Sequence, residues 1–202
     1  SASGVNCGVR RYRPDVGILI SEFPAVAAGV FTLNECKAAP VKYSQKLLPA
    51  DNIRAIVTNS GQANAATGIE GEQKNLDFVQ AVANQLQVDT NQVLIASTGV
   101  IGAQLATDKL IPSIPELVMR AQETAESFAL AILTTDLVPK TFSTTVQLSA
   151  GEMKITGISK GSGMIHPNMA TMLGYILTDA KITKDIASDI LKSSTDVSFN
   201  MI

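Results

Sequence analysis

The sequence predicts a mixed α/β protein, of the layered α/β or α+β kind. Short apolar runs of strand length are interspersed with segments of helical periodicity along the 202 residues. Strands and helices do not alternate strictly, which argues against a doubly wound parallel sheet. With 46% hydrophobic and 17% charged residues, the chain has the composition of a folded domain and is long enough to bury a core.

The first predicted elements are strands. Residues 16–21 and 29–32 are expected to form two short strands separated by a turn at Pro24. Residues 53–57 are an apolar run that ends in Asn-Ser-Gly at 59–61, which is typical of a buried strand leading into a loop.

A helix and a further strand follow. Thr67 and Glu70 have the spacing of a capping box and predict that a helix begins there. Its expected apolar face consists of Leu76, Val79, Ala83 and Leu86. Residues 93–96 are predicted to form a strand that leads into Ser-Thr-Gly at 97–99.

A second capping-box spacing, Ser113 with Glu116, predicts that another helix begins at Ser113. Its apolar face would comprise Leu117, Ala121, Ala125, Phe128 and Ile132. Residues 141–148 and 153–158 bracket Ser-Ala-Gly at 149–151, which indicates a hairpin.

The last third of the chain begins with a glycine-rich loop at 160–168. Residues 172–177 are a mostly apolar run, predicted as a buried strand rather than a surface strand. Residues 184–191 are expected to be helical.

Composition excludes several classes of function. Sixteen basic and 18 acidic residues give a net charge of −2, which argues against a dedicated nucleic-acid-binding protein. No apolar run approaches the roughly 20 residues needed to span a membrane. Cys7 and Cys36 lack metal-ligand spacing, so a reducing, cytoplasmic compartment is expected. A single histidine excludes an HExxH zinc site, and no metal is expected.

The glycines near Lys160 do not form a nucleotide-binding motif. The GxGxxG pattern fails because position 166 is His, and Lys160 precedes its glycines, whereas the P-loop lysine follows them. A catalytic triad would have to use His166, but no GxSxG sequence supports one. Beside Pro167, this histidine is interpreted as a residue that forms hydrogen bonds within its loop.

Three polar segments, at 58–64, 97–99 and 160–171, follow apolar strands. A Thr-Gly turn after a strand can aim a hydroxyl and a backbone N–H at one point, as an oxyanion hole requires. Spacing alone favours an ordinary turn containing glycine. Similarly, Thr-Thr-Asp at 134–136 could bind a ligand or end a helix, and Lys160 could hold a carboxylate or be solvated.

Residues 160–173, with the sequence KGSGMIHPNMATML, resemble the self-cleavage region of the ornithine acetyltransferase family, the glutamate N-acetyltransferases of arginine biosynthesis. Further segments resemble that family in the same order, so the resemblance covers nearly the whole chain. These segments are 28–32, 37–41, 59–64, 97–102 and 134–136.

The resemblance implies that a precursor cuts itself between Ala170 and Thr171. The threonine hydroxyl attacks the preceding carbonyl in an N→O acyl shift, and water then releases the first chain. The new α-amine of Thr171, with an ordinary pKa of about 7.7–8.0, can act as the base for its own hydroxyl. Such an enzyme needs no histidine for acyl transfer.

The implied reaction is a ping-pong acetyl transfer. Thr171 takes the acetyl group from N2-acetylornithine, and glutamate then attacks the acetyl-threonine ester. By resemblance, the Thr98 hydroxyl and the Gly99 N–H stabilise the oxyanion.

Lys160 and either Thr134 or Thr135 match substrate-binding positions of the family. A cation at Lys160 suits a substrate carboxylate. No prosthetic group is implied, although acetyl-CoA is an additional acetyl donor in some members of the family.

The implied fold is a sandwich of stacked β-sheets flanked by helices, similar to N-terminal-nucleophile hydrolases but with a different topology. Residues 1–202 would be the N-terminal, or α-chain, part of a precursor about twice as long, running past the expected cleavage site. The partner would be the C-terminal, or β, chain, with two copies of each chain in the assembly. Two alternatives remain: a self-cleaving aminopeptidase of related fold, and a non-catalytic module kept for assembly.

Overall fold

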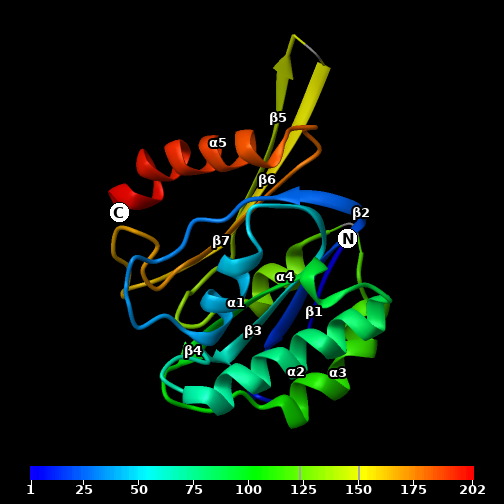
Figure 1. The fold of residues 1–202 in the computed structure, drawn as a ribbon, viewed down its shortest axis with the longest axis vertical. Coiled ribbons are helices and arrows are strands. Elements are labelled where there is room, and N and C mark those ends of the chain that lie inside the picture. Colours follow the sequence, from blue (N-terminus) through cyan, green and yellow to red (C-terminus); the bar gives the residue numbers. More distant parts are fainter. Residues whose placement is uncertain (123, 150) are drawn as a thin grey trace.

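Two β-sheets form the centre of the molecule (Figure 1). The computed structural model describes residues 1–122, 124–149 and 151–202. The first sheet has the strand order β1-β2-β3-β4, and the second has the order β5-β6-β7. The strands are β1 (Ala2–Val5), β2 (Val16–Ala27), β3 (Ala50–Gln62), β4 (Val93–Val100), β5 (Lys140–Leu148), β6 (Gly151–Lys160) and β7 (Leu173–Thr178).

Helices lie beside both sheets (Figure 1). The α-helices are α1 (Ala39–Leu47), α2 (Gly68–Leu86), α3 (Thr107–Met119), α4 (Glu126–Ala131) and α5 (Lys184–Asp196), and two 3-10 turns are η1 (Thr90–Gln92) and η2 (Phe199–Met201). Strands β1, β2 and β3 pair antiparallel, whereas β3 and β4 pair parallel. The parallel pair needs a crossover connection, which α2 supplies.

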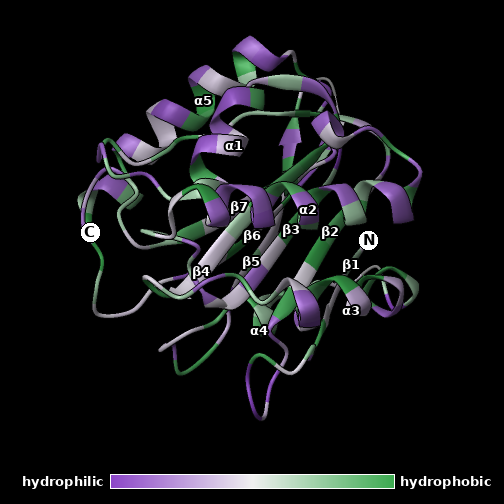
Figure 2. Ribbon diagram, turned by 60° about the horizontal axis from the view of Figure 1, so that its bottom comes forward, coloured by the Kyte–Doolittle hydropathy of each residue, from purple (hydrophilic) through white to green (hydrophobic). Residues whose placement is uncertain are grey.

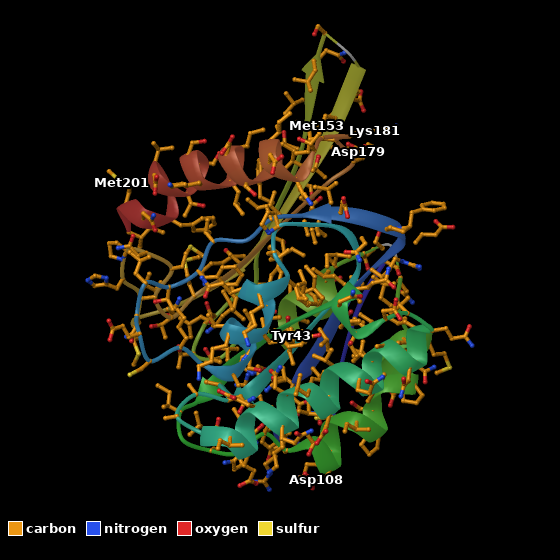
Figure 3. The ribbon with its side chains drawn as sticks, in the orientation of Figure 1. Tyr43, Asp108, Met153, Asp179, Lys181 and Met201 are labelled. Atoms are coloured by element: carbon orange, nitrogen blue, oxygen red, sulfur yellow. The ribbon has the colours of Figure 1, made fainter. Side chains whose placement is uncertain are left out.

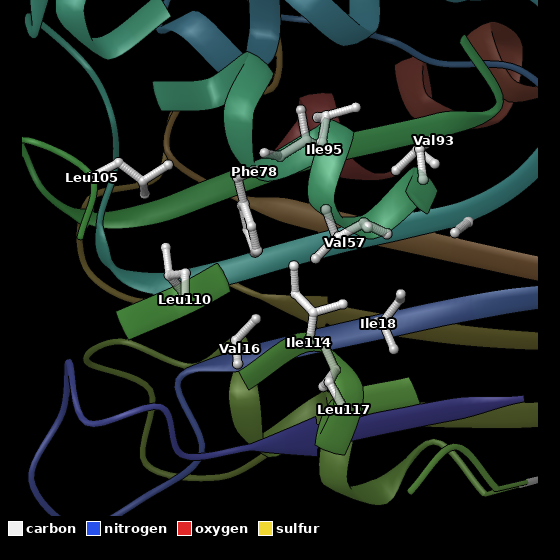
Figure 4. Packing of buried hydrophobic residues seen from close by; sticks show 14 of the residues in the cluster. Val16, Ile18, Val57, Phe78, Val93, Ile95, Leu105, Leu110, Ile114 and Leu117 are labelled. Atoms are coloured by element: carbon white, nitrogen blue, oxygen red, sulfur yellow. The ribbon is translucent and has the colours of Figure 1, made fainter. Parts of the chain in front are cut away.

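One face of the first sheet packs against α2 and α3. Figure 4 shows Phe78 of α2 and Ile114 of α3 reaching toward Val16 and Val57 on the strands. All four side chains are buried, and they belong to the larger hydrophobic core. Burying a side chain of this size stabilises the fold by about 1.5–3 kcal/mol. This core fixes the first sheet on its helical layer.

The other face of the first sheet packs against α4 and the second sheet. Phe128 of α4 meets Tyr175 of β7 edge to face, with ring centroids 5.1 Å apart. The Tyr175 hydroxyl shares a 2.7 Å hydrogen bond with Thr58 Oγ1 of β3. Successive side chains of a strand point to opposite faces, so Val57 faces the helices while Thr58 faces the second sheet. The molecule is therefore a mixed α/β sandwich of two sheets flanked by helices, as expected.

Helix α1 packs beside β4. The sequence analysis did not predict this helix. Pro40 in its first turn suits a helix start, because proline lacks the N–H that would be unpaired there. The Ser44 hydroxyl donates to the carbonyl of Ile95 at 2.8 Å, and the Tyr43 hydroxyl donates to that of Thr90 at 2.7 Å. Tyr43 is labelled in Figure 3. In Figure 2, the central strands are mainly hydrophobic, whereas the helices carry hydrophilic residues on their outer turns.

The expected turn at Pro24 is wrong. Strand β2 continues through this residue to Ala27, with a shift in register between Ile20 and Ala25 that accommodates the proline. Residues 29–32 form no regular element, so the second short strand is also wrong. The loop expected at 59–61 is instead the end of β3, and β4 likewise runs through 97–99 as far as Val100.

Helix boundaries differ from those expected. Helix α2 starts as predicted, but the Thr67 hydroxyl donates to Asn64 Oδ1 and makes no capping hydrogen bond. Its expected face is partly shifted, since Leu76 is exposed and Phe78 is buried. The start at Ser113 is wrong, because α3 begins at Thr107 and contains Pro112 and Pro115 inside it.

The single helix predicted from the apolar stripe is wrong: Leu117 lies in α3 and Phe128 lies in α4, whereas the other members of the stripe lie outside both helices. The hairpin of β5 and β6 is confirmed, with residue 150 of its expected 149–151 turn outside the described residues. The expected helix at 184–191 is the first part of α5. Strand β7 was expected to be a buried strand, but only Tyr175 is buried, because the face of the second sheet that carries Ile176 is turned away from the first sheet.

Candidate active site

The parallel pair of β3 and β4 positions the first part of the candidate site. Their register places Ser60 opposite Thr98 and Gly61 opposite Gly99. A Cβ atom on Gly99 would lie only 2.4 Å from the carbonyl carbon of Gly61, and Gly99 has a φ of +127°. Only glycine fits where the two backbones come this close, so the structure requires a glycine at position 99.

Thr98 is contacted by the lysine that ends β6. Lys160 Nζ lies 2.9 Å from Thr98 Oγ1 and donates a hydrogen bond to it. The side chains come from different sheets, so this bond bridges the sandwich. Lys160 is only 4% exposed. Two residues that the sequence analysis selected from segments 62 positions apart therefore meet in one place.

Thr171 precedes the strand that pairs with Lys160. Leu173 of β7 lies opposite Lys160 in the ladder, so the backbone brings Thr171 to the same end of the second sheet. His166 and Ala170 form an isolated antiparallel bridge with backbone hydrogen bonds of 3.2 and 3.3 Å. This bridge closes a short loop just before the Ala170–Thr171 bond.

The loop holds an unusual backbone conformation. Asn168, Met169 and Thr171 have φ values of 62°, 58° and 62°. A β-branched residue such as threonine rarely adopts positive φ, and each such residue costs on the order of 1–3 kcal/mol. Thr171 itself is exposed. The backbone at the expected cleavage bond is therefore strained and accessible.

Asp136 connects the segments around Lys160. Its carboxylate accepts hydrogen bonds from Gly161 N at 2.8 Å, from Lys140 Nζ at 2.5 Å and from Thr134 N at 3.4 Å. Burial would raise the pKa of Asp136, but these hydrogen bonds, led by the one from Lys140, lower it to about 2. The carboxylate therefore remains ionised and holds the start of the glycine-rich loop.

Two arginines from the loop before β2 hold the same turn. Arg10 donates to the carbonyls of Leu133 and Thr134, the latter at 3.2 Å, and Arg13 donates to the carbonyl of Thr134. The Arg10 loop is itself fixed by buried Asp15, which accepts from the Arg10 backbone N–H at 2.7 Å. The 133–136 turn is thus held by the arginines at its carbonyl groups and by Asp136 at its backbone N–H.

The two candidate threonines in this turn differ in their surroundings. Thr135 is exposed, and its hydroxyl donates to the Ser162 carbonyl at 3.4 Å. Thr134 is half-buried, and its backbone is held by Asp136 and the arginines. Both lie beside the glycine-rich loop, so the geometry does not separate their roles.

The local electrostatics are mainly positive. Burial lowers the pKa of Lys160, nearby Asp136 opposes this shift, and Lys140 and Arg10 add to it. Burial likewise lowers the pKa of Arg10. The carboxylates of Asp136 and Asp15 thus lie among a larger number of cations, which suits a site where a substrate carboxylate or an oxyanion gains negative charge.

The structure shows where several of the predicted site residues lie. The structure brings Lys160, Thr98 and Gly99 together, with Thr171 on the adjoining strand connection. His166 is exposed and its Nδ1 lies 3.1 Å from the Pro167 carbonyl, which agrees with a loop role.

The sequence analysis missed Arg10 as a site residue, and it gave Asp136 no separate role. Both act on backbone groups far away in sequence, and only the Thr-Thr-Asp triplet itself was a usable signal for Asp136.

No cluster of three or more His, Cys, Asp or Glu side chains suited to a metal ion occurs in the described parts of the chain. Within those same ranges, no helix has the length and apolarity needed to cross a membrane. The donors at the site are hydroxyls, backbone amides and ammonium or guanidinium groups. Such groups can bind an acyl substrate and stabilise a tetrahedral intermediate.

The chain resembles known proteins over its full length. The relative from Thermotoga neapolitana, described as arginine biosynthesis bifunctional protein ArgJ, is 47% identical over 204 residues, covering 100% of this chain and 51% of the relative. The protein of the same description from Staphylococcus saprophyticus is 46% identical over 202 residues, covering 100% of this chain and 49% of the relative. The chain thus spans about half the length of the curated relatives it matches. A relative from Oryza sativa subsp. indica, 44% identical over 100% of this chain and 45% of its own, is described as chloroplastic.

Two solved structures share the fold. The crystal structure of arginine biosynthesis bifunctional protein ArgJ from Bacillus halodurans superposes with a TM-score of 0.77 at 38% identity, over 84% of this chain and 90% of that chain. Ornithine acetyltransferase from Mycobacterium tuberculosis, crystallised with ornithine, gives a TM-score of 0.76 at 34% identity, over 85% of this chain and 91% of that chain.

The fold and the polar cluster therefore place the chain in the class of mixed α/β proteins that these two crystal structures represent. The model of the ArgJ family matches residues 1–202. With relatives of 46–47% identity along its whole length, the chain belongs to the ArgJ family.

Proposed function

We propose that this chain forms part of an ornithine acetyltransferase that moves an acetyl group from N2-acetylornithine to glutamate in arginine biosynthesis. The observation that carries the proposal is the 2.9 Å hydrogen bond between Lys160 and Thr98, next to the strand connection that holds Thr171. It brings an acyl-transfer donor group and a cation to the end of the sheet where the nucleophile is expected. The ornithine in the Mycobacterium tuberculosis structure supports the choice of substrate class.

Self-cleavage between Ala170 and Thr171 is the first step of the proposal. Positive φ at Thr171 raises the energy of the intact chain, and cleavage removes that constraint. This chain covers nine tenths of each crystallised relative but only half of the full-length relatives. The crystallised chains are therefore about half-length themselves, which supports a division of the family's polypeptide near its middle.

Acetyl transfer then follows with Thr171 as nucleophile. Its free α-amine accepts the hydroxyl proton while the hydroxyl attacks the acetyl carbonyl, and ornithine leaves with a proton. The Thr98 hydroxyl and the Gly99 N–H donate to the oxyanion of each tetrahedral intermediate. Glutamate attacks the acetyl ester, giving N-acetylglutamate and restoring Thr171. Lys160, with Thr134 or Thr135, holds the substrate.

The remainder of the longer protein is proposed as the partner, with two copies of each chain in the assembly. Phe142 of β5 lies opposite Gly157 of β6, which lies opposite Ile176 of β7, so these residues form one row on the second sheet. The row of Thr141, Ile158 and Tyr175 faces the first sheet, so the Phe142 row faces away from it. Phe142 is 73% exposed and Ile176 is 51% exposed. An apolar row of this kind suits burial by another chain.

Replacement of the nucleophile in the full-length protein tests the proposed function. Thr171→Ala should leave the precursor uncut and abolish acetyl transfer, because the attacking hydroxyl is gone. Thr90→Ala, in η1, is the matched control and should cut itself and transfer acetyl groups normally. Intact mass reports cleavage, and labelled acetylornithine and acetyl-CoA, offered separately, report the donor. Acetyl transfer by Thr171→Ala at the wild-type rate would refute the assignment of the nucleophile.

The two donors also separate the remaining alternatives. Acetylornithine is expected to label Thr171 efficiently and acetyl-CoA poorly, since the sequence of the described residues contains no P-loop for the phosphates of CoA. Efficient N-acetylglutamate formation from acetyl-CoA alone would make the enzyme bifunctional. Peptide hydrolysis without any acetyl label would favour the aminopeptidase.

A further inference from the structure

We propose that Lys160 acts on the reaction through Thr98, as a positioning residue that directs the Thr98 hydroxyl proton toward the oxyanion. The inference rests on the proposed acetyl-transfer function and refines it at one residue, because Lys160 acts through Thr98 instead of binding the substrate carboxylate directly. It starts from the hydrogen bond in which Lys160 Nζ donates to Thr98 Oγ1 at 2.9 Å.

The direction of this hydrogen bond follows from the groups themselves. An ammonium group has three protons and no acceptor, whereas a hydroxyl has one proton and two lone pairs. Lys160 must therefore donate, and Thr98 Oγ1 must accept. The hydroxyl proton of Thr98 cannot point back at Lys160, and among the described residues no other protein acceptor takes it. It remains available to a group that enters the site.

A cation on the oxygen also strengthens the hydroxyl as a donor. Hydrogen bonds polarise one another in chains, and a charged first member has the larger effect. When an oxyanion forms in front of Thr98, the sequence ammonium, hydroxyl, oxyanion has every dipole aligned. The benefit grows as negative charge develops, so it stabilises the transition state more than the bound substrate.

Burial makes this arrangement a fixed one. Lys160 is 4% exposed, its backbone is paired with Leu173, and the next residue, Gly161, donates its N–H to Asp136 at 2.8 Å. A solvated lysine would sample many rotamers, but this one is held at both backbone and head group. The oxyanion donor is thus oriented before substrate arrives, which is the property that makes such sites effective.

The charges around Lys160 affect the pH range in which its ammonium group can donate to Thr98. Asp136 faces it with opposite charge, while Lys140 and Arg10 face it with like charge, and burial lowers its pKa. On losing its proton, Nζ gains a lone pair and can accept the Thr98 proton, which turns that proton away from the oxyanion. Transfer should therefore fall at alkaline pH in the wild type, and this loss should be absent when residue 160 cannot titrate.

A double-mutant cycle in the full-length protein tests the proposal. Lys160→Met, Thr98→Val and the double variant are compared for kcat and KM with acetylornithine and glutamate. Each single change should lower kcat by about 10²–10³-fold, the usual loss of an oxyanion donor, with KM changed less than about threefold. The double variant should be no more than about threefold slower than Thr98→Val, because Lys160 acts only through that hydroxyl.

Two results would contradict the proposal. If the two losses multiply in the double variant, or if Lys160→Met raises KM while kcat is unchanged, Lys160 acts directly on substrate and the proposal is wrong. Lys74→Met, on α2, is the control lysine and should behave as wild type. A variant that matures slowly is compared by its rate of self-cleavage instead, since that reaction also passes through an oxyanion.

Failure of this inference is distinguishable from failure of the proposed function. A wild-type protein that neither acquires an acetyl group on Thr171 nor forms N-acetylglutamate contradicts the function itself. An active wild type whose two variants have multiplicative effects contradicts only the role of Lys160.

Discussion

Asp136 shows how one buried side chain can connect several segments of the candidate site. Its two carboxylate oxygens hold the N–H groups of Thr134 and Gly161 and the ammonium of Lys140. These groups belong to a turn, to the glycine-rich loop and to the start of β5. A buried carboxylate with several donors is stabilised in its ionised form, so its pKa is lowered to about 2. Loss of these hydrogen bonds should lower the free energy of unfolding.

Asp136→Asn should therefore destabilise the protein in a pH-dependent way. Because the folded-state pKa lies below the ordinary value of 3.8, the ionised carboxylate contributes stability above about pH 4 and loses it as the pH falls toward 2. A shift of this size corresponds to about 2 kcal/mol at neutral pH. Urea unfolding of wild type and variant between pH 2 and 7 measures the difference.

The matched control for this change is Asp108→Asn, at the exposed start of α3 (Figure 3). Its effect on the free energy of unfolding should stay below about 1 kcal/mol, as for a charge near a helix terminus. A difference between wild type and Asp136→Asn that is the same at pH 2 and pH 7 would contradict the assigned role of the carboxylate.

Sequence reasoning reached some of these residues and not others, for a physical reason. Thr98, Gly99 and Lys160 stand in short motifs at strand ends, where local sequence and family resemblance both give a signal. Arg10 acts by donating to the carbonyl of Thr134, 124 positions away. A bond from a side chain to a distant backbone carbonyl leaves no mark on the sequence around that carbonyl.

Among the elements, the ends of strands were the hardest to predict. Asn-Ser-Gly at 59–61 and Ser-Thr-Gly at 97–99 have the composition of loops, yet both segments lie in the β3–β4 ladder. Pairing of two such segments satisfies their backbone groups and overrides their local preference. Helix α3 similarly continues through Pro112, because Leu110, Ile114 and Leu117 on its inner face are buried in the core.

The close approach of β3 and β4 predicts a large steric cost at one glycine. Gly99→Ala would place Cβ 2.4 Å from the Gly61 carbonyl carbon, and both strands would have to separate. We expect a loss of stability on the order of 3 kcal/mol or more, from overpacking and backbone strain together. Chemical denaturation of the full-length variants measures it.

Gly102 provides the comparison, since its φ is +83° but open space surrounds the position of a Cβ atom. Gly102→Ala should cost only the backbone strain, about 1–2 kcal/mol. Equal losses for the two variants would show that the approach of Gly61 to Gly99 is not what requires a glycine at position 99.

On the scale of the whole molecule, the two sheets differ in how completely they are covered. The first sheet has helices on one face and the second sheet on the other. The second sheet packs inward through Ile158 and Tyr175 and leaves the row of Phe142 and Ile176 exposed. The apolar run at 172–177 predicted a buried strand, but only Tyr175 of β7 is buried among the described residues.

A charge on the exposed row should therefore interfere with assembly of the full-length protein. Phe142→Asp is expected to leave the fold of the described residues intact, because this side chain is 73% exposed there. If the rest of the longer protein covers the row, an aspartate buried in that interface costs several kcal/mol, as an unpaired charge removed from water does. Native mass spectrometry and co-purification of the cleaved chains then show dissociation or loss of the larger assembly.

Ile69→Asp is the control for this prediction. Ile69 is 86% exposed in the first turn of α2, where an added negative charge suits the helix terminus. This variant should assemble like the wild type. If Phe142→Asp assembles with equal strength, the outer face of the second sheet is open to solvent in the whole protein, and the partner chain must bind elsewhere. Loss of assembly confined to Phe142→Asp would instead place that partner over β5, β6 and β7, next to the end of the sheet where Lys160 meets Thr98.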